Sequence, residues 1–119
     1  EIEEPYRYLA RELNRIGLVY VHVVDHSAMG APEVPSSIKE IIRDEFVNTL
    51  ILAGGYDQAR AESDISSGKA DLIAIGRPFI NNPDLVDRIA KGKPLSTELF
   101  TDLFYSPDEK GYTDYPVSK

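Results

Sequence analysis

The stretch between Val47 and Pro83 constrains the fold of this chain most strongly, because it contains two strand patterns joined through one helix pattern. An apolar run at Thr49–Ala53 is too short for a helix and ends at a pair of glycines, which predicts a strand followed by a turn. The sequence then predicts a helix over residues 57–67 and a second strand at Asp71–Ile75. A crossover this short requires parallel strands and a right-handed strand–helix–strand unit.

Each of these two strands ends in a glycine turn: Gly54–Gly55 after the first, and Gly76–Arg77 after the second. Parallel strands bring both turns to one edge of the sheet, the edge where α/β folds bind ligands. Adjacent glycines let backbone N–H groups approach an anion, and Arg77 adds a charged fork of donors. We therefore consider a phosphate site at this edge. Alternatively, the glycines only allow tight turns, and Arg77 pairs with Asp71 or Asp84.

The rest of the chain continues the alternation of strands and helices. The run LVYVHVV is typical of a strand buried on both faces, because it is almost entirely β-branched or aromatic. Glu40 follows Ser37 at the spacing of a capping box, which predicts a serine cap for the helix there. The further expected elements are a helix at Pro5–Ile16, a strand at Leu18–Val24, a helix from Ser36 or Ser37 to about Phe46, and a helix from Asn82–Pro83 to Ala90.

These elements predict an α/β fold in which residues 1–93 form three strand–helix units preceded by a helix. Residues 94–119 form an aromatic-rich tail with a possible short helix near Thr97–Leu103. Three parallel strands leave two unpaired edges, and each unit has the size of one eighth of a ~250-residue barrel. The chain begins in mid-pattern and its only methionine is Met29, so we expect a piece of something longer.

Composition and residue patterns exclude several classes of function. The chain has 119 residues and a formal charge of −7, which argues against nucleic-acid binding. It has no cysteine, which excludes disulfides and thiolate chemistry without identifying the compartment. No apolar run reaches membrane length and no signal-peptide pattern opens the chain, and we expect a cytoplasmic protein. Asp25 points away from His22 and His26 on a strand, so we predict no metal site. No nucleophile–base pair is present, and we predict no catalytic residue within this chain.

Four segments then carry a family resemblance: YVHVVD, LILAGGYD, DLIAIGRPFINNPDLVDRI and LFYSPDEKGYTDYP. Among them, GRPFINNPDL and GYTDYP are far more specific than a lone pair of glycines. With these segments the chain resembles the C-terminal part of the old yellow enzyme family, the FMN-dependent NAD(P)H oxidoreductases and ene-reductases. The resemblance implies a TIM (β/α)8 barrel, of which this chain supplies about strands 6–8 and is incomplete on its own.

The resemblance also implies roles for particular residues. The turn of Ala53, Gly54, Gly55 and Tyr56, together with Gly76–Arg77, matches the family's site for the FMN phosphate. Phe104 and Tyr105 match a pair near the flavin ring and the substrate pocket. The family's catalytic tyrosine and its His/Asn pair belong to the earlier barrel, outside this chain. The complete enzyme would use NAD(P)H as hydride donor and reduce an activated, enone-type alkene.

Three hypotheses about function follow from the sequence. The favoured one is the FMN-phosphate-binding portion of an ene-reductase, whose partner is the missing N-terminal barrel portion. The second is part of a different phosphate-binding barrel enzyme that shares only the last two loops. The third is a non-catalytic half-barrel module that is stable through self-association, since its strand edges and one sheet face lack partners.

Overall fold

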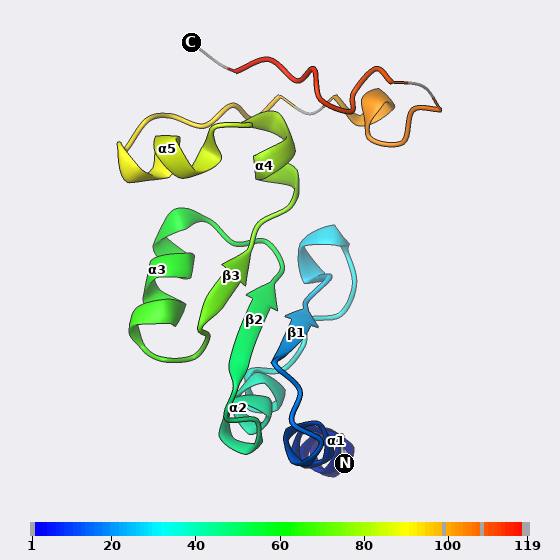
Figure 1. Ribbon diagram of the computed structural model, residues 1–119, viewed down its shortest axis with the longest axis vertical. Coiled ribbons are helices and arrows are strands. Elements are labelled where there is room, and N and C mark those ends of the chain that lie inside the picture. Colours follow the sequence, from blue (N-terminus) through cyan, green and yellow to red (C-terminus); the bar gives the residue numbers. More distant parts are fainter. Residues whose placement is uncertain (1, 99, 108, 118–119) are drawn as a thin grey trace. The chain divides into compact units, whose positions relative to one another are not determined.

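The computed structural model describes residues 2–98, 100–107 and 109–117 and divides into two compact units, Glu1–Ala74 and Ile75–Lys119. The first unit alternates helices and strands, as predicted, with its three strands pointing the same way (Figure 1). Its elements are α1 (Glu3–Arg15), β1 (Tyr20–Val24), a 3₁₀ turn (Ser27–Met29), α2 (Ser36–Glu45), β2 (Thr49–Ala53), α3 (Gln58–Ser66) and β3 (Leu72–Ala74).

The three strands form one parallel sheet in the order β1-β2-β3, which confirms the predicted parallel pairing. At its carboxyl edge the register aligns Val24 with Ala53 and Ala53 with Ala74. The pairing of β1 continues one residue further, because the Asp25 N–H donates to the Ala53 oxygen at 2.9 Å. The chain segments that leave β1, β2 and β3 therefore start from the same edge of the sheet.

Helices cover one face of this sheet. The core contains Leu50 and Leu52 of β2 with apolar side chains of α1 and α2, namely Ala10, Ile38 and Ile42. The opposite face lacks such cover: Tyr20, Val24 and Leu72 are 56%, 45% and 52% exposed. The prediction that the first strand is buried on both faces is therefore wrong for this chain. The reason is that the helices of this unit pack against one face of the sheet only.

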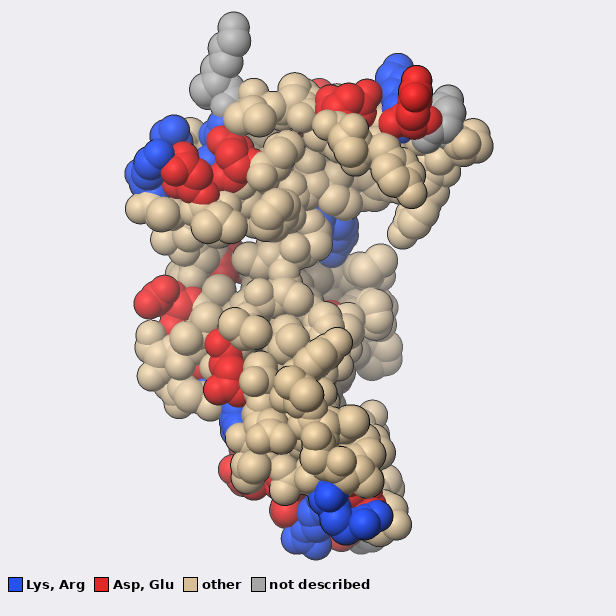
Figure 2. Space-filling view, viewed as in Figure 1, with Lys and Arg blue, Asp and Glu red and all other residues tan. Residues whose placement is uncertain are grey.

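Ion pairs connect α1 to α2 at the outer side of the first unit. Arg7 Nη1 lies 2.7 Å from Glu45 Oε1, and Arg11 Nε lies 2.8 Å from Glu45 Oε2. Arg11 is 60% exposed, whereas Arg7 and Glu45 are partly buried at 32% and 18%, and Figure 2 shows a basic patch over α1. Ion pairs that remain in contact with solvent contribute little to stability, so the apolar core holds the two helices together.

One prediction about the helices of this unit is corrected. Pro35, not a serine, occupies the N-cap of α2, and the cap makes no side-chain hydrogen bond, so the predicted capping box is absent. Pro35 holds the extended backbone that precedes the helix (φ −53°, ψ 141°), which leaves the first serine inside it. By contrast, the Asp57 side chain caps α3 by accepting the Arg60 N–H at 2.8 Å.

The second unit contains α4 (Arg77–Asn81), α5 (Leu85–Ala90) and a 3₁₀ turn (Thr101–Leu103). Helix α4 is not among the elements predicted from the sequence, and the predicted last helix begins at Leu85 instead of Asn82. Of the possible helix near Thr97–Leu103, the structure shows only the 3₁₀ turn, and Leu99 lies outside the described residues.

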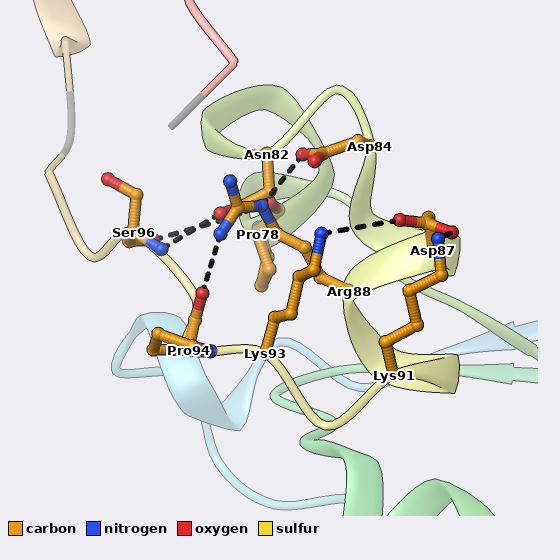
Figure 3. Close-up of polar contacts among 9 residues, drawn as sticks. All are labelled: Pro78, Asn82, Asp84, Asp87, Arg88, Lys91, Lys93, Pro94 and Ser96. Carbon is orange, nitrogen blue, oxygen red and sulfur yellow. Dashed lines mark hydrogen bonds and ion pairs between the residues drawn. The ribbon is translucent and has the colours of Figure 1, made fainter. Parts of the chain in front are cut away.

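Two buried polar side chains connect these helices to the segment that follows them (Figure 3). Asn82 donates to the oxygens of Pro78 and Ser96 at 2.9 and 3.1 Å, and it accepts the Ser96 N–H at 2.8 Å. Arg88 donates to Asp84 at 2.8 Å and to the Pro94 oxygen at 2.9 Å. Asn82 itself has a non-helical backbone (φ −134°, ψ 84°), so it ends α4 instead of starting the next helix.

Candidate functional site

The turn after β2 has a conformation that only glycine fits. Gly54 and Gly55 have φ angles of +129° and +60°. A Cβ at Gly54 would lie 2.2 Å from the backbone oxygen of Asp25, and one at Gly55 would lie 2.9 Å from Cβ of Ala28. Within the described part of the chain, no residue accepts the N–H of either glycine. The turn thus combines close approach with donors that remain available to a ligand.

Behind this turn lies a buried ion pair that the sequence analysis did not anticipate. Asp25 follows β1 directly and its side chain is 4% exposed. Its Oδ2 lies 2.7 Å from Lys39 Nζ, and its Oδ1 accepts the Ser27 N–H at 2.9 Å. The hydrogen bond from Lys39 and the Ser27 N–H hold the pKa of the Asp25 carboxyl well below its ordinary value. Asp25 is therefore ionised throughout the physiological pH range.

Tyr56 and Arg60 form the outer side of the same turn. Tyr56 is buried, and its hydroxyl donates to Asp64 at 2.8 Å. Burial and the neighbouring carboxylate raise the pKa of Tyr56 to about 12. The Arg60 guanidinium stacks 4.2 Å from the centre of the Tyr56 ring and donates to the Gly54 oxygen at 3.2 Å. Arg60 is thus a second basic group at the turn, and it was not among the predicted site residues. The sequence signal that could have indicated it is a basic residue in the first turn of a helix that follows two glycines.

The second predicted turn begins α4 in the other unit. Gly76 is the N-cap of α4, and Arg77 is the first residue of the helix and is exposed. The two carboxylates considered as partners of Arg77 are taken by other arginines: Asp71 pairs with Arg43 at 2.6 Å, and Asp84 with Arg88 at 2.8 Å. Within the described residues of its own unit, Arg77 makes no ion pair. The predicted pair of Arg77 with Asp84, which lies in the same unit, is therefore absent from the described structure.

The two aromatic residues proposed for the pocket follow the 3₁₀ turn of the second unit. Phe104 is half-buried, whereas Tyr105 is 97% exposed. No group of three metal-binding side chains occurs among the residues that the structure describes. No helix in the described ranges is long and apolar enough to cross a bilayer.

Comparison with known proteins places these features in a family. Residues 7–96 match the NADH:flavin oxidoreductase / NADH oxidase family. The chain belongs to this family. The matched region includes β2 with its glycine turn and the start of α4 with Arg77. The resemblance to old yellow enzymes, with an α/β fold built on a small parallel sheet, is confirmed.

Named relatives agree with this family. A 12-oxophytodienoate reductase-like protein of Solanum lycopersicum is 39% identical over 92% of this chain and 29% of its own length. Chanoclavine-I aldehyde reductase of Penicillium roqueforti is 35% identical over 95% of this chain and 32% of its own length. In the solved structure of morphinone reductase, the match covers 98% of this chain and 31% of that one, with a TM-score of 0.86 and 41% identity. The chain thus spans about a third of these proteins.

Proposed function

We propose that this chain is the FMN-phosphate-binding, C-terminal portion of an NAD(P)H-dependent flavin oxidoreductase that reduces activated alkenes. In this proposal its strands are about strands 6–8 of a TIM barrel, and the rest of the barrel comes from the portion that precedes them in the relatives. The observation that carries the proposal is the glycine turn after β2, which lies within the family match and leaves its N–H groups without an acceptor in the described chain.

The residues present fit a phosphate. Gly54 and Gly55 offer backbone donors in a turn that a side chain would fill, and Ala53 and Tyr56 fix its two ends. Arg77 would add a bidentate charged contact, for which its guanidinium is available within its unit. FMN, when bound, supplies the hydride transfer from nicotinamide to alkene. The chain itself binds and orients, and Phe104 and Tyr105 would shape the pocket beside the flavin ring.

FMN and riboflavin differ only in the phosphate, so their relative affinity tests the proposal directly. Residues 1–119 would be joined behind the part of morphinone reductase that precedes its matched region, and each flavin titrated by fluorescence and by its visible absorption at about 450 nm. We expect FMN to bind more tightly. Arg77→Ala should lower FMN affinity by about 1.5–3 kcal/mol, the value of a hydrogen bond to a charged group, and leave riboflavin affinity unchanged.

The control is Arg15→Ala, which removes an exposed arginine of α1 whose only ion pair among the described residues is with Glu12. It should change neither affinity. Equal affinity for FMN and riboflavin in the unaltered protein would contradict a phosphate site. Absence of any flavin binding would favour the non-catalytic half-barrel, and tight binding of other phosphate compounds in preference to FMN would favour a different barrel enzyme.

A further inference from the structure

Two ion pairs connect helix α2 to opposite ends of the sheet in the first unit. At the carboxyl end, Lys39 Nζ lies 2.7 Å from Asp25 Oδ2. One helical turn later, Arg43 Nη1 lies 2.6 Å from Asp71 Oδ2, just before β3 begins. Each carboxylate also accepts one backbone N–H. The pairs are alike in chemistry and differ in which edge of the sheet they hold.

The pair at the carboxyl edge lies directly behind the glycine turn. The Asp25 backbone oxygen occupies the space where a side chain of Gly54 would begin, and Ala28 does the same for Gly55. The Asp25 carboxylate accepts the Ser27 N–H and so fixes the backbone between these two contact points. Residues 25–28 therefore form the surface against which the turn packs, which we call the 25–28 wall. The ion pair of Lys39 with Asp25 connects this wall to α2.

Stability alone does not account for this ion pair. The side chains of Asp25 and Lys39 are only 4% and 17% exposed, so removing both charges from water offsets most of their attraction. Such a pair contributes little net stability. The contacts around it constrain residues 25–28, the wall that lies against Gly54 and Gly55.

We propose that Asp25 and Lys39 are positioning residues for phosphate binding: they hold the 25–28 wall, and through it the Gly54–Gly55 turn, in the conformation whose N–H groups contact the FMN phosphate. Neither side chain touches the cofactor in this proposal. The inference rests on the proposed function of the turn and adds to it two residues that lie outside the predicted site.

The test uses the same completed barrel and the ratio of FMN to riboflavin affinity. Asp25→Asn keeps the shape and an acceptor for the Ser27 N–H but removes the charge. We expect Asp25→Asn and Lys39→Met to lower the ratio about tenfold, as a weakened charged contact would. Lys39→Arg retains the charge and should restore most of the ratio. In the FMN-bound protein, where the phosphate would protect the Gly54 and Gly55 N–H groups, amide hydrogen exchange of residues 53–56 should accelerate in the two charge-removing variants only.

Arg43→Met is the matched control, because its side chain is 23% exposed against 17% for Lys39 and its pair lies at the other edge. Arg43→Met should keep the ratio of FMN to riboflavin affinity within about twofold of that of the unaltered protein, since distant sites act independently. If Lys39→Met and Asp25→Asn weaken both flavins equally, the pair serves stability only and the proposal is overturned. The same follows if the ratio does not change while Arg77→Ala still lowers it. If Arg77→Ala has no effect either, the proposed function fails as well.

Discussion

The backbone oxygen of Asp25 lies 2.2 Å from the position that a Cβ of Gly54 would occupy. The two residues come from the ends of neighbouring parallel strands, β1 and β2, which are aligned up to Val24 and Ala53. The contact excludes a methyl group at Gly54 in addition to the positive φ angle of the turn, which by itself already disfavours alanine. It also means that the turn cannot move without the end of β1.

Replacement of Gly54 by alanine should therefore be severe. The φ angle of +129° is unfavourable for alanine, and the added methyl would overlap the Asp25 backbone, so we expect a loss of about 2–5 kcal/mol. Gly17→Ala is the control, because Gly17 has a φ of +75° with open space around it and should cost only about 1–2 kcal/mol. Urea unfolding at fixed protein concentration measures the free energy of unfolding of both variants. Equal losses would show that the contact with Asp25 adds nothing to the cost of the positive φ angle.

Tyr56 should make the protein sensitive to high pH. Its pKa is about 12 when folded and 10 when unfolded, so below pH 10 both states keep the proton and the contribution is complete. Between pH 10 and about 12 the unfolded state ionises first, and stability falls as pH rises. Tyr56→Phe should remove the part of this fall in stability that the Tyr56 hydroxyl causes. The measurement is the free energy of unfolding in urea across this pH range, with the exposed Tyr105→Phe as control. If the pH dependence of stability is the same in Tyr56→Phe as in the unaltered protein, Tyr56 is not its source.

The uncovered sheet face should make the isolated chain associate with itself. Tyr20, Val24 and Leu72 are half-exposed on that face, and β1 and β3 have free edges within the described chain. We expect sedimentation to show dimers or larger species, and Leu72→Lys to shift them toward monomer. Val47→Lys, at an exposed valine outside the strands, should not. A monomeric unaltered chain with strongly protected strand amides would show the expectation to be wrong.

The sequence predicted the elements whose signal is local. The apolar run at Thr49–Ala53 gave the bounds of β2, because its length and its glycine end are both visible in the sequence. By contrast, β3 is two residues shorter than predicted. Asp71 lies outside it, since its carboxylate pairs with Arg43 and accepts the Leu50 N–H. Such contacts join residues far apart in the chain, and local periodicity carries no record of them.

The same distinction applies to the candidate site. The glycines and Arg77 could be found because turns after strands have a residue signature. Lys39 and the wall at Asp25 could not, because a lysine on a helix face usually indicates solvent. Helix α4 was missed because glycine and proline around Arg77 indicate a turn, although proline also favours the first turn of a helix.

The last prediction concerns Tyr105, whose side chain is 97% exposed in this chain. An exposed tyrosine offers a largely apolar ring and one polar hydroxyl to a ligand that contacts it. We predict that in the complete enzyme Tyr105 shapes substrate binding and does not donate the proton. Tyr105→Phe should therefore change the turnover or the preference of the alkene half-reaction several-fold, while reduction of the flavin by NAD(P)H changes less.

Stopped-flow measurement of the two half-reactions separates these outcomes. Tyr112→Phe is the control, because Tyr112 lies in the same tail and is 81% exposed, and it should affect neither half-reaction. Loss of the phenol hydroxyl removes the polar end of Tyr105 and keeps its ring, so an effect confined to the alkene step assigns the hydroxyl to the substrate. If neither half-reaction changes, or the variant fails only by unfolding, Tyr105 contributes packing and no substrate contact.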